Sequence, residues 1–302
     1  MFFKSNCMNV AKSDMISVIV CSVSQERLSR LCKNVDETIG VEYEMVAVDN
    51  RQLGWPIARV YNEGARRASG RCLLFVHEDV VFHQQDWGRA LIGRLASPDC
   101  GVIGFAGSKV KLDVYSGWWQ NHAGWDCCSY IQNGVRCVQG GRLQEGVLSF
   151  EPVVTLDGFA LLVRREVWEE FPFDEDVLKG FHCYDLDFTL AVGRKYTNYV
   201  CGGIAVEHLS SGNLDGRWYE TTVQLHDTKW KPLLPVRTAD VRWTEEERRR
   251  TSEDLSYRFL HNALRSSYSR KRYLLHAFWR RPFGWKHLEH CLSCTLKYLR
   301  VR

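Results

Sequence analysis

The first sign of chemistry in this sequence is a group of acidic residues that directly follows an apolar run. The run Cys72–Val76 leads into His77, Glu78 and Asp79. Five consecutive apolar residues are typical of a strand that is buried on both faces. Carboxylates at the end of such a strand are costly unless they are paired, and a divalent cation is a natural partner because hard cations prefer oxygen ligands. The alternative is a loop carboxylate that only caps the next helix.

Further polar residues begin or follow other apolar segments: Asp49 with Asn50, Asp157 with Gly158, Asp185 with Asp187, and His208. Asp185 and Asp187 are one residue apart, so each carboxylate can raise the pKa of the other. Asp49 and Asp157 also fit turn positions, where an acid bonds its own backbone.

The elements that must position these residues alternate between strand and helix in the first hundred residues. We predict strands at 16–20, 43–48, Cys72–Val76 and 102–106, and helices at 24–32, 56–69 and 86–95, the last capped by Asp86. This alternation predicts a mostly parallel sheet with right-handed crossovers. Ligands of such sheets bind outside the carboxyl ends of the strands, where Ser22, Asp49, Glu78 and Asp79 all lie. Ser22 also fits a simpler role as the cap of the following helix.

The middle of the chain loses this periodicity. Residues 107–152 combine tryptophans, glycines and no clear pattern, and their aromatic content argues against disorder. Such a long irregular segment is usually functional. Order returns with a strand at 159–163, helices at Arg165–Glu170 and 183–194, and a strand region at 199–206. From about Thr244 the pattern is helical.

Composition limits the class of protein. Hydrophobic residues make up 45% and charged residues 25%, as in ordinary globular proteins, and a net charge of +4 is too small to indicate nucleic-acid binding. No apolar stretch approaches the ~20 residues that span a bilayer, and the first residues lack a signal-peptide pattern. The 12 cysteines are scattered, as expected of small buried residues in a reducing compartment. We therefore expect a cytoplasmic protein.

The C-terminal region has a charge bias of its own. From Leu255 onward Glu289 is the single acidic residue among many Lys and Arg, and tryptophans and phenylalanines are interspersed. Basic and aromatic residues together are typical of a helix that lies on an anionic membrane surface. This would place the protein at the inner face of the membrane. A helical cap on the α/β domain or a subunit contact fits the composition equally well.

The order and spacing of the polar motifs resemble the inverting glycosyltransferases of family 2, which have the GT-A fold. The resemblance covers about residues 15–212. The motif at His77 to Val80 is most similar to a bacterial subgroup of capsule and cell-surface sugar transferases. The matching stretches are Ile16-Ser-Val-Ile-Val-Cys-Ser, Val46-Ala-Val-Asp49-Asn, Tyr61-Asn62-Glu-Gly64, Phe75-Val-His-Glu-Asp79-Val, Leu156-Asp157-Gly158-Phe, Phe173-Asp-Glu, Tyr184-Asp185-Leu-Asp187-Phe and Val206-Glu-His208-Leu-Ser.

The resemblance implies a division of the chain and a metal site. The chain would comprise a tail (1–14), a catalytic domain (15–243) with a nucleotide-binding half up to 106 and an acceptor and metal half after it, and a basic helical extension (244–302). Asp79 and His208 would ligate Mn²⁺ or Mg²⁺, which bridges the phosphates of a nucleotide sugar, with a UDP-sugar favoured. His77 is expected only to end the strand. Donor contacts would come from Ser22, Asp49, Asn62, Gly64, Glu78, Asp157 and Gly158.

The resemblance also implies a catalytic base. Asp185 would take the proton of the acceptor hydroxyl, and Asp187 would support it or contact the acceptor. Tyr184 replaces the family's usual Glu, so the choice between the two acids stays open. Trp118 and Trp119 are either core residues or a platform that stacks on the acceptor sugar.

The sequence thus predicts a metal-dependent inverting glycosyltransferase of mixed, mostly parallel α/β fold. It would move a sugar from a nucleoside diphosphate to a hydroxyl of a cell-surface polysaccharide or glycolipid precursor. One alternative is a catalytically inactive protein of the same fold that binds glycans or nucleotides. Another is a sugar nucleotidyltransferase, although the glycine-rich basic loop expected after its first strand is missing at 21–25. A scaffold acting through the basic tail is the third.

Overall fold

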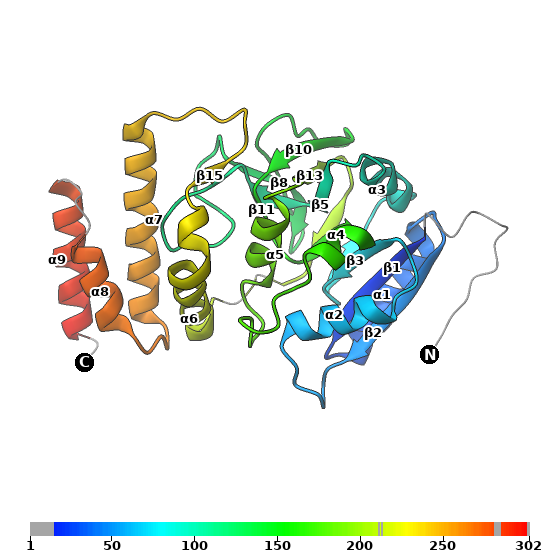
Figure 1. Ribbon diagram of the computed structural model, residues 1–302, viewed down its shortest axis with the longest axis horizontal. Helices are drawn as coiled ribbons and strands as arrows, with labels where there is room; N and C mark the ends of the chain where they lie inside the picture. The colour runs from blue at the N-terminus through cyan, green and yellow to red at the C-terminus, as the bar shows by residue number, and fades with distance from the viewer. Residues whose placement is uncertain (1–14, 211, 213, 281–284, 301–302) are drawn as a thin grey trace.

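A seven-stranded sheet forms the centre of the molecule (Figure 1). The computed structural model describes residues 15–210, 212, 214–280 and 285–300. The strand order is β10-β13-β5-β12-β3-β1-β2. One direction is shared by β1 (Ile16–Ser22), β2 (Tyr43–Asp49), β3 (Cys72–Val76), β5 (Cys100–Gly104) and β13 (Thr197–Gly202). The opposite direction is taken by β10 (Ser149–Val153) and β12 (Ala160–Arg164). The predicted mixed, mostly parallel α/β fold is therefore confirmed.

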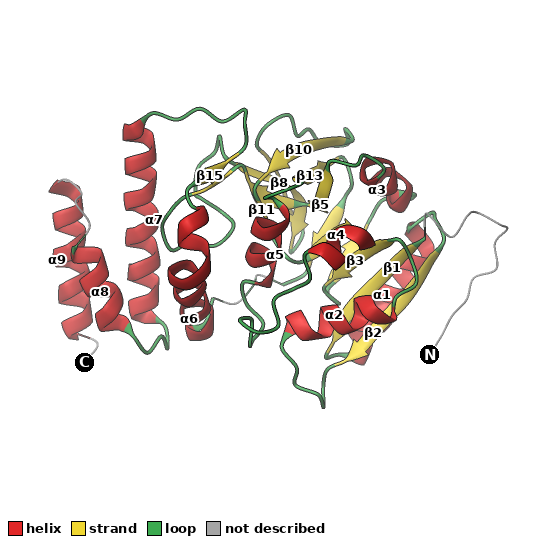
Figure 2. Ribbon diagram, in the orientation of Figure 1, coloured by secondary structure: helices red, strands yellow, loops and turns green. Residues whose placement is uncertain are grey.

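Helices cover both faces of this sheet (Figure 2). Every residue of β3 is buried, as its apolar run predicts. Leu73 and Phe75 face the layer of α2 (Ile57–Arg67), α4 (Arg165–Glu170) and α5 (Tyr184–Val192). Leu74 and Val76 face α1 (Gln25–Thr38) and α3 (Trp87–Leu95). Burial on both sides holds β3 rigidly, so the residues that follow it start from a fixed point.

A second sheet extends from the end of β3. Its order is β11-β6-β8-β14-β4, with β9 paired to β8. The strands are β4 (Val80–Phe82), β6 (Ala106–Ser108), β8 (Asp126–Gln132), β9 (Val135–Gln139), β11 (Thr155–Leu156) and β14 (Val206–His208). A short pair of β7 (Val110–Lys111) with β15 (Val236–Arg237) lies apart from it.

The prediction of an irregular segment at 107–152 is wrong. The segment holds the antiparallel hairpin of β8 and β9, closed by Asn133 and Gly134 with positive φ angles of 47° and 79°. Asn-Gly is the preferred pair for such a two-residue turn, because both positions need positive φ. The turn signal was present in the sequence, but the flanking strands lack clear alternation.

Two helix starts show how local chemistry sets the boundaries. Ser24 caps α1 by accepting a hydrogen bond from the Arg27 amide, so Ser22 does not serve as the cap. Asp86 precedes α3, but its side chain makes no capping bond and its backbone is left-handed, with φ of 58°. The predicted side-chain cap at Asp86 is therefore wrong, and the residue serves as a turn.

The C-terminal region is helical, as predicted from Thr244 onward. It comprises α6 (Gly216–Leu225), which precedes the predicted boundary and is capped by Asp215, a short π-helix (His226–Trp230), a 3₁₀ turn (Lys231–Leu233), α7 (Glu245–Arg265), α8 (Lys271–Trp279) and α9 (Trp285–Arg300). Thr244 and Glu247 form a capping box at the start of α7. Tyr219 and Val223 of α6 share a core with Phe259 of α7, which joins the extension to the α/β part. Helix α9 lies outermost, farthest from β1 and β2 (Figure 1).

The structure can be compared with the sequence on two features, membrane-spanning helices and cysteines. Among the described residues, no helix is both long and apolar enough to cross a bilayer. Apart from Cys72, the described cysteines from Cys21 to Cys294 are free thiols. Most of them are buried, and burial raises the pKa of several, for example Cys21 and Cys100 to about 11. They behave as small core residues.

Candidate active site

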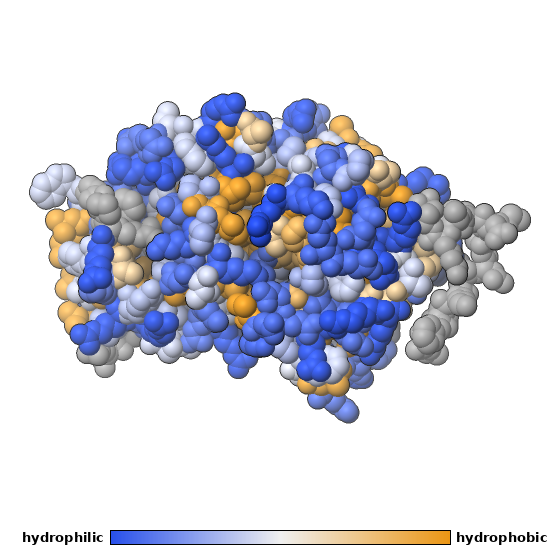
Figure 3. All heavy atoms as spheres, viewed as in Figure 1, coloured by the Kyte–Doolittle hydropathy of each residue, from blue (hydrophilic) through white to orange (hydrophobic). Residues whose placement is uncertain are grey.

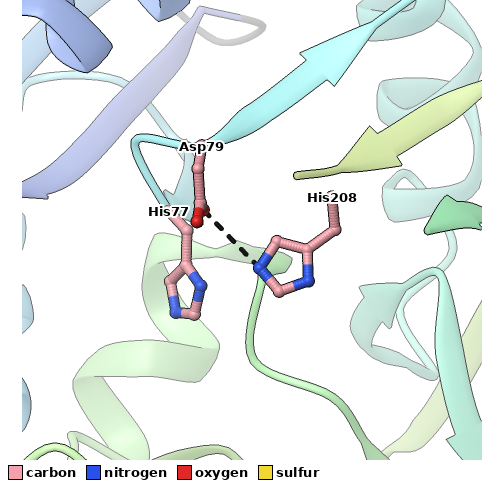
Figure 4. A group of neighbouring side chains, drawn as sticks. All are labelled: His77, Asp79 and His208. Atoms are coloured by element: carbon pink, nitrogen blue, oxygen red, sulfur yellow. Dashed lines mark ion pairs between the residues drawn. The ribbon is translucent and has the colours of Figure 1, made fainter. Parts of the chain in front are cut away.

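The turn after β3 and the end of β14 meet at one point. Strand β4 continues from the turn and pairs with β14 in antiparallel register, which sets His208 opposite Val80. The Leu209 amide also donates to the Asp79 carbonyl at 3.0 Å. Backbone pairing therefore places the His208 side chain beside Asp79, although 129 positions separate them in the chain (Figure 4).

His77, Asp79 and His208 form a cluster of ligand atoms. The Asp79 Oδ1 atom lies 3.5 Å from His208 Nε2, and the two imidazole centroids are 5.6 Å apart. One ligand atom from each of the three residues lies within 4.8 Å of the others, and Figure 4 shows the side chains converging. Asp79 Oδ1 is buried and has no hydrogen-bond partner. A buried carboxylate oxygen left without a hydrogen-bond partner is what a cation would satisfy, so the three residues fit a metal ion.

The charge state of Asp79 suits the same role. Burial by itself would raise the pKa of its carboxyl, but the adjacent His208 outweighs burial, and the pKa of Asp79 is lowered to about 2. His208 is held in place by stacking on Phe159, with ring centroids 5.1 Å apart and 12° between the planes. Asp79 is thus an anion at neutral pH beside a fixed imidazole.

Tyr184 determines which nitrogen of His77 carries the proton. The Tyr184 hydroxyl donates to the Gly158 carbonyl at 2.9 Å, and it lies 2.7 Å from His77 Nε2. A carbonyl can only accept, so the tyrosine proton is engaged there and His77 Nε2 must donate its own proton to the tyrosine oxygen. Burial lowers the pKa of His77 to about 4, which keeps the ring neutral. Nδ1 is then unprotonated, the form that ligates a metal.

His77 is the main addition that the structure makes to the predicted site. The sequence predicts only that it ends the strand, whereas it lies in the metal-ligand cluster. Its hydrogen-bond partner comes from α5, 107 residues further on. No local pattern around His77 signals that contact.

Glu78 points the other way along the turn. Its Oε2 atom accepts from the amides of Val23 and Ser24, each at 3.1 Å. These bonds tie the turn after β3 to the loop after β1, so the ends of two neighbouring strands are locked together. The Oε1 atom is buried and has no hydrogen-bond partner. Glu78 also lines the cavity described next.

A cavity of about 700 Å³ opens beside the cluster. This volume is within the range of ligand pockets. Its lining includes His77, Glu78, Asp79 and His208 on one side, and Cys21, Asn50, Trp55, Phe181 and the cations Arg27, Lys179 and Arg217 around the rest. Cationic side chains facing a metal-ligand cluster favour an anionic ligand. Trp55 adds an aromatic surface on which a planar ring can stack.

Asp185 lies at the start of α5 and is half-buried. Burial, together with the negative charge of Asp157, raises the pKa of Asp185 to about 7. Asp157 is itself held in place, because its Oδ1 accepts from the Phe159 amide at 3.1 Å and its Oδ2 from Trp118 Nε1 at 2.6 Å. The turn role considered for Asp157 is therefore real, and its second oxygen orients Trp118.

Asp187 has a different environment from Asp185. It is buried, its Oδ2 accepts from Lys229 Nζ at 2.8 Å and its Oδ1 from Trp230 Nε1 at 3.0 Å. Lys229 also binds Asp174 at 2.6 Å. Both oxygens of Asp187 thus hold the segment after α6 against α5, and a cation neutralises the charge. Asp185 has no cationic partner of this kind among the described residues.

The family described as "Glycosyltransferase like family" matches residues 17–222, which is most of the chain and includes every site residue named so far except Lys229 and Trp230. This protein belongs to that glycosyltransferase-like family. No curated protein matches its sequence. The family match gives the general activity, transfer of a sugar, and leaves the donor and the acceptor open.

Three solved structures resemble this glycosyltransferase at low scores. A mannosyltransferase, PcManGT from Pyrobaculum calidifontis in complex with GDP-Man and Mn²⁺, is 12% identical with a TM-score of 0.45, covering 96% of this chain and 88% of that chain. GalNAc-T7 with UDP, GalNAc and Mn²⁺ is 9% identical with a TM-score of 0.48 (72% and 48% covered). A197 from STIV is 15% identical with a TM-score of 0.37 (65% and 86%). At these scores the similarities add no argument to the family match.

Some donor-binding residues predicted for this glycosyltransferase lie outside the cavity lining. Asp49 is exposed, and the Arg51 guanidinium, at 2.8 Å, lowers the pKa of Asp49 to about 2. Its neighbour Asn50 lines the cavity instead and holds Trp55, whose amide donates to Asn50 Oδ1 at 2.8 Å. Sequence reasoning missed Trp55, although an aromatic residue directly before the helix-starting Pro56 was a usable signal.

Ser22, Asn62 and Gly64 are buried within the glycosyltransferase and do not line the cavity. The Asn62 amide is fully used inside the protein, where it bonds the backbone of Phe173 and the indole of Trp168. Gly64 lies where a Cβ atom would come within 2.4 Å of an Ile19 methyl group, so it allows α2 to pack closely on β1. These residues therefore pack behind the site and do not face the cavity.

On the Asp185 side of the glycosyltransferase, the two predicted acceptor residues differ in exposure. Trp118 is half-buried and bound to Asp157, while Trp119 is 44% exposed. Gly158 lies between Asp157 and the start of β12, and a Cβ atom there would be 2.3 Å from the Tyr184 hydroxyl oxygen. Glycine at this position is therefore required for the hydrogen bond between Tyr184 and the Gly158 carbonyl.

A second cavity of about 810 Å³ lies at the other edge of the large sheet. Its lining includes Lys109, whose ammonium group lies between Glu151 and Asp240, and the further cations Arg194 and Arg237. It is lined by β10, β13 and β15 and shares no residue with the metal-ligand cluster. Its chemistry is therefore less suited to transfer than that of the cavity at Asp79.

Proposed function

We propose that this protein is a metal-dependent, inverting glycosyltransferase that uses a nucleoside diphosphate sugar. The observation that carries the proposal is the cluster of His77, Asp79 and His208, in which a buried Asp79 oxygen has no hydrogen-bond partner, beside a cavity with cationic walls. A diphosphate combines the two features that this arrangement matches, namely negative charge and oxygen ligands for a metal.

The three clustered residues would hold the ion through His77 Nδ1, the Asp79 carboxylate and a nitrogen of His208. Two imidazole ligands favour Mn²⁺ over Mg²⁺, because Mg²⁺ prefers oxygen ligands. When bound, the ion supplies charge neutralisation for the departing diphosphate. Tyr184 keeps His77 in the ligating tautomer, and Phe159 keeps the His208 ring in place.

The remaining donor contacts come from the cavity wall. Arg27, Lys179 and Arg217 would neutralise the phosphates, and Trp55 would stack on the base. The resemblance in sequence favours uridine as the base. Because Asp49 lies just outside the lining and next to Asn50, it would contact the ribose or base only if Arg51 releases it.

Asp185 is proposed as the base. Its carboxylate would accept the hydroxyl proton of the acceptor as the oxygen attacks the anomeric carbon, in a single displacement that inverts the configuration. A pKa of about 7 makes it a much stronger proton acceptor than an ordinary carboxylate at neutral pH. Asp187 would hold α5 in place through Lys229 and Trp230. Trp118, fixed by Asp157, and the exposed Trp119 would contact the acceptor sugar.

The wider setting is proposed from the sequence resemblance. The acceptor would be a hydroxyl of a cell-surface polysaccharide or glycolipid precursor, as in the bacterial capsule subgroup, and the reaction would occur in the cytoplasm. The catalytic domain would span 15–243, with the donor half up to residue 106, and the helical extension would follow. The proposed tail at 1–14 lies outside the described residues.

A thermal-shift screen tests the donor and metal proposals together. A ligand that binds only the folded state raises its melting temperature, so UDP, GDP and their sugars are compared with and without Mn²⁺. We expect a nucleotide shift that requires Mn²⁺ and is lost in Asp79→Asn. Glu169→Gln, which changes an exposed carboxylate on α4, is the matched control and should keep the shift.

Three outcomes would contradict the proposal. A nucleotide shift that is unchanged without metal and in Asp79→Asn would exclude the cluster as the metal site. Binding without any release of the sugar, to acceptor or to water, would indicate an inactive binding protein. Formation of a nucleotide sugar from a sugar phosphate would indicate a nucleotidyltransferase.

A further inference from the structure

Helix α9 presents a continuous apolar stripe to solvent. The exposed fractions are 85% for Trp285, 40% for Leu288, 52% for Leu292, 58% for Leu296 and 60% for Leu299. Spacings of three and four residues put these side chains on one face of the helix. Figure 3 shows hydrophobic residues along the outer side of α9, at the left edge of the view. We call these five residues the outer stripe.

The opposite face of α9 fixes how the helix is turned. His287, Cys291 and Cys294 are buried there, and Cys291 and Cys294 join the core formed with Leu274 and Phe278 of α8. The helix therefore already has a complete inner face, and the outer stripe is surplus to the fold. An exposed apolar surface of this size usually marks an interaction site.

The charges around the outer stripe are mostly positive. Arg272 of α8, Arg280 directly after α8, and Lys286 and Arg300 of α9 are exposed, and among the described residues they form no ion pair within 4 Å. Glu289 is the single acidic residue in α8 and α9. The surface thus combines an apolar stripe with a positive rim.

We propose that the outer stripe of α9 lies in the surface of an anionic lipid bilayer. Leucines and a tryptophan would enter the boundary between headgroups and acyl chains, and the basic rim would face lipid phosphates. A second copy of the chain matches the apolar stripe but not the charge, because a symmetric contact would bring the two positive rims together. This inference concerns where the enzyme binds and does not depend on the proposed function.

Vesicle flotation with the full chain tests the proposal. Vesicles of phosphatidylcholine with phosphatidylglycerol are compared with vesicles of phosphatidylcholine alone, at low and high salt. We expect binding to the anionic vesicles that falls at least tenfold at high salt, because screening weakens exposed charges. Binding to neutral vesicles should be weak.

Two variants assign the binding to the outer stripe. The double variant Leu292→Glu/Leu296→Glu should lose at least nine-tenths of the binding. Leu148→Glu is the matched control, since Leu148 has the same 52% exposure as Leu292 but lies before β10. Circular dichroism and melting temperatures test whether both variants are folded. We expect that they are, because the replaced side chains are exposed.

The proposal is overturned by any of three results. The first is no binding to anionic vesicles by the native chain. The second is binding that survives in the double variant. The third is a dimer, seen by sedimentation, that dissociates in the double variant, which would assign the stripe to a second copy. None of these measurements requires transfer activity. A failure of the membrane proposal can therefore be distinguished from a failure of the proposed function.

Discussion

At the scale of single residues, the candidate metal site depends on which nitrogen of His77 carries the proton. Tyr184 donates to the Gly158 carbonyl and accepts from His77 Nε2, which leaves His77 Nδ1 free to ligate. The residue directly after Tyr184 is Asp185, whose raised pKa suits its role as the proposed base. In the proposed function, Tyr184, which replaces the family's usual Glu, would serve the metal side of the site, and Asp185 would serve the acceptor side.

We predict that Tyr184→Phe weakens Mn²⁺ binding by about 10–100-fold, the usual effect of losing a partner behind a metal ligand. Without the hydroxyl, His77 is no longer held in the ligating tautomer. Isothermal calorimetry with Mn²⁺ measures the change. Tyr268→Phe is the control, because the Tyr268 hydroxyl is buried without a hydrogen-bond partner in the core that α6 shares with α7, away from the metal-ligand cluster. Equal affinity in Tyr184→Phe and the native chain would contradict the role of Tyr184.

We predict that Asp185→Asn abolishes transfer but stabilises the fold. The folded-state pKa of Asp185 is about 7, above its ordinary 3.8, so the buried charge costs stability progressively as pH rises from about 4 to about 7. The neutral amide removes this cost. At pH 8 the melting temperature should rise by about 2–4 °C, the shift for about 1 kcal/mol in a domain of this size.

The pH dependence provides the control for this variant. Near pH 4.5 the melting temperatures of Asp185→Asn and the native chain should nearly coincide, and the difference should become constant above pH 7. A difference that is independent of pH would show that Asp185 does not titrate near neutrality. Asp187→Asn should instead destabilise the fold, because it leaves Lys229 with a weaker partner.

At the scale of elements, the site lies where the two sheets and the start of α5 meet. The turn after β3 supplies His77 and Asp79, β14 supplies His208 through its pairing with β4, and the start of α5 packs against Gly158. Glu78 closes this joint by binding the loop after β1. The arrangement holds only if α5 can approach the start of β12 closely.

We predict that Gly158→Ala disrupts this approach. The new methyl group would lie 2.3 Å from the Tyr184 hydroxyl oxygen and 3.0 Å from Asp185 Cβ. Overpacking of this kind costs about 1–3 kcal/mol, and both Mn²⁺ affinity and activity should fall. Chemical denaturation and calorimetry measure the two effects. Gly93→Ala in α3 is the control, with open space around its Cβ, and should be neutral or stabilising.

At the scale of the whole molecule, the helical extension has two roles that separate along the chain. Helix α7 completes the core, because Leu255 packs with Val110, Leu112 and Trp125, and Phe259 packs with α6. The inner face of helix α9 covers α8 and also packs on α7, where the His290 imidazole stacks on Tyr257 with ring centroids 3.8 Å apart. The alternatives of a helical cap and a surface helix thus apply to different helices of the same extension.

We predict that removing residues 244–302 and removing 285–302 have different effects. The longer deletion exposes apolar residues of two clusters, so the chain should aggregate or melt at least 10 °C lower. The shorter deletion should leave transfer to a soluble acceptor intact and reduce vesicle binding. Melting curves and transfer assays on both truncated chains measure this. Full stability after the longer deletion would contradict the role of α7.

The sequence alone determined what depends on neighbouring residues. The apolar run at Cys72–Val76 predicts a doubly buried strand because burial on both faces requires continuous apolar side chains, and the structure has that strand. The alternation of segments predicts the mostly parallel sheet for the same local reason. The order of the motifs resembles the family and pairs Asp79 with His208 as metal ligands. The structure places Asp79 Oδ1 3.5 Å from His208 Nε2.

Only the tertiary structure decided what depends on contacts between distant segments. His77 became a ligand candidate through Tyr184, Asp185 was separated from Asp187 through Lys229, and the outer stripe of α9 was turned to solvent by packing on α8. Hydrogen bonds, ion pairs and packing across such distances leave no periodic trace in a single sequence, because only the folded chain brings the partners together.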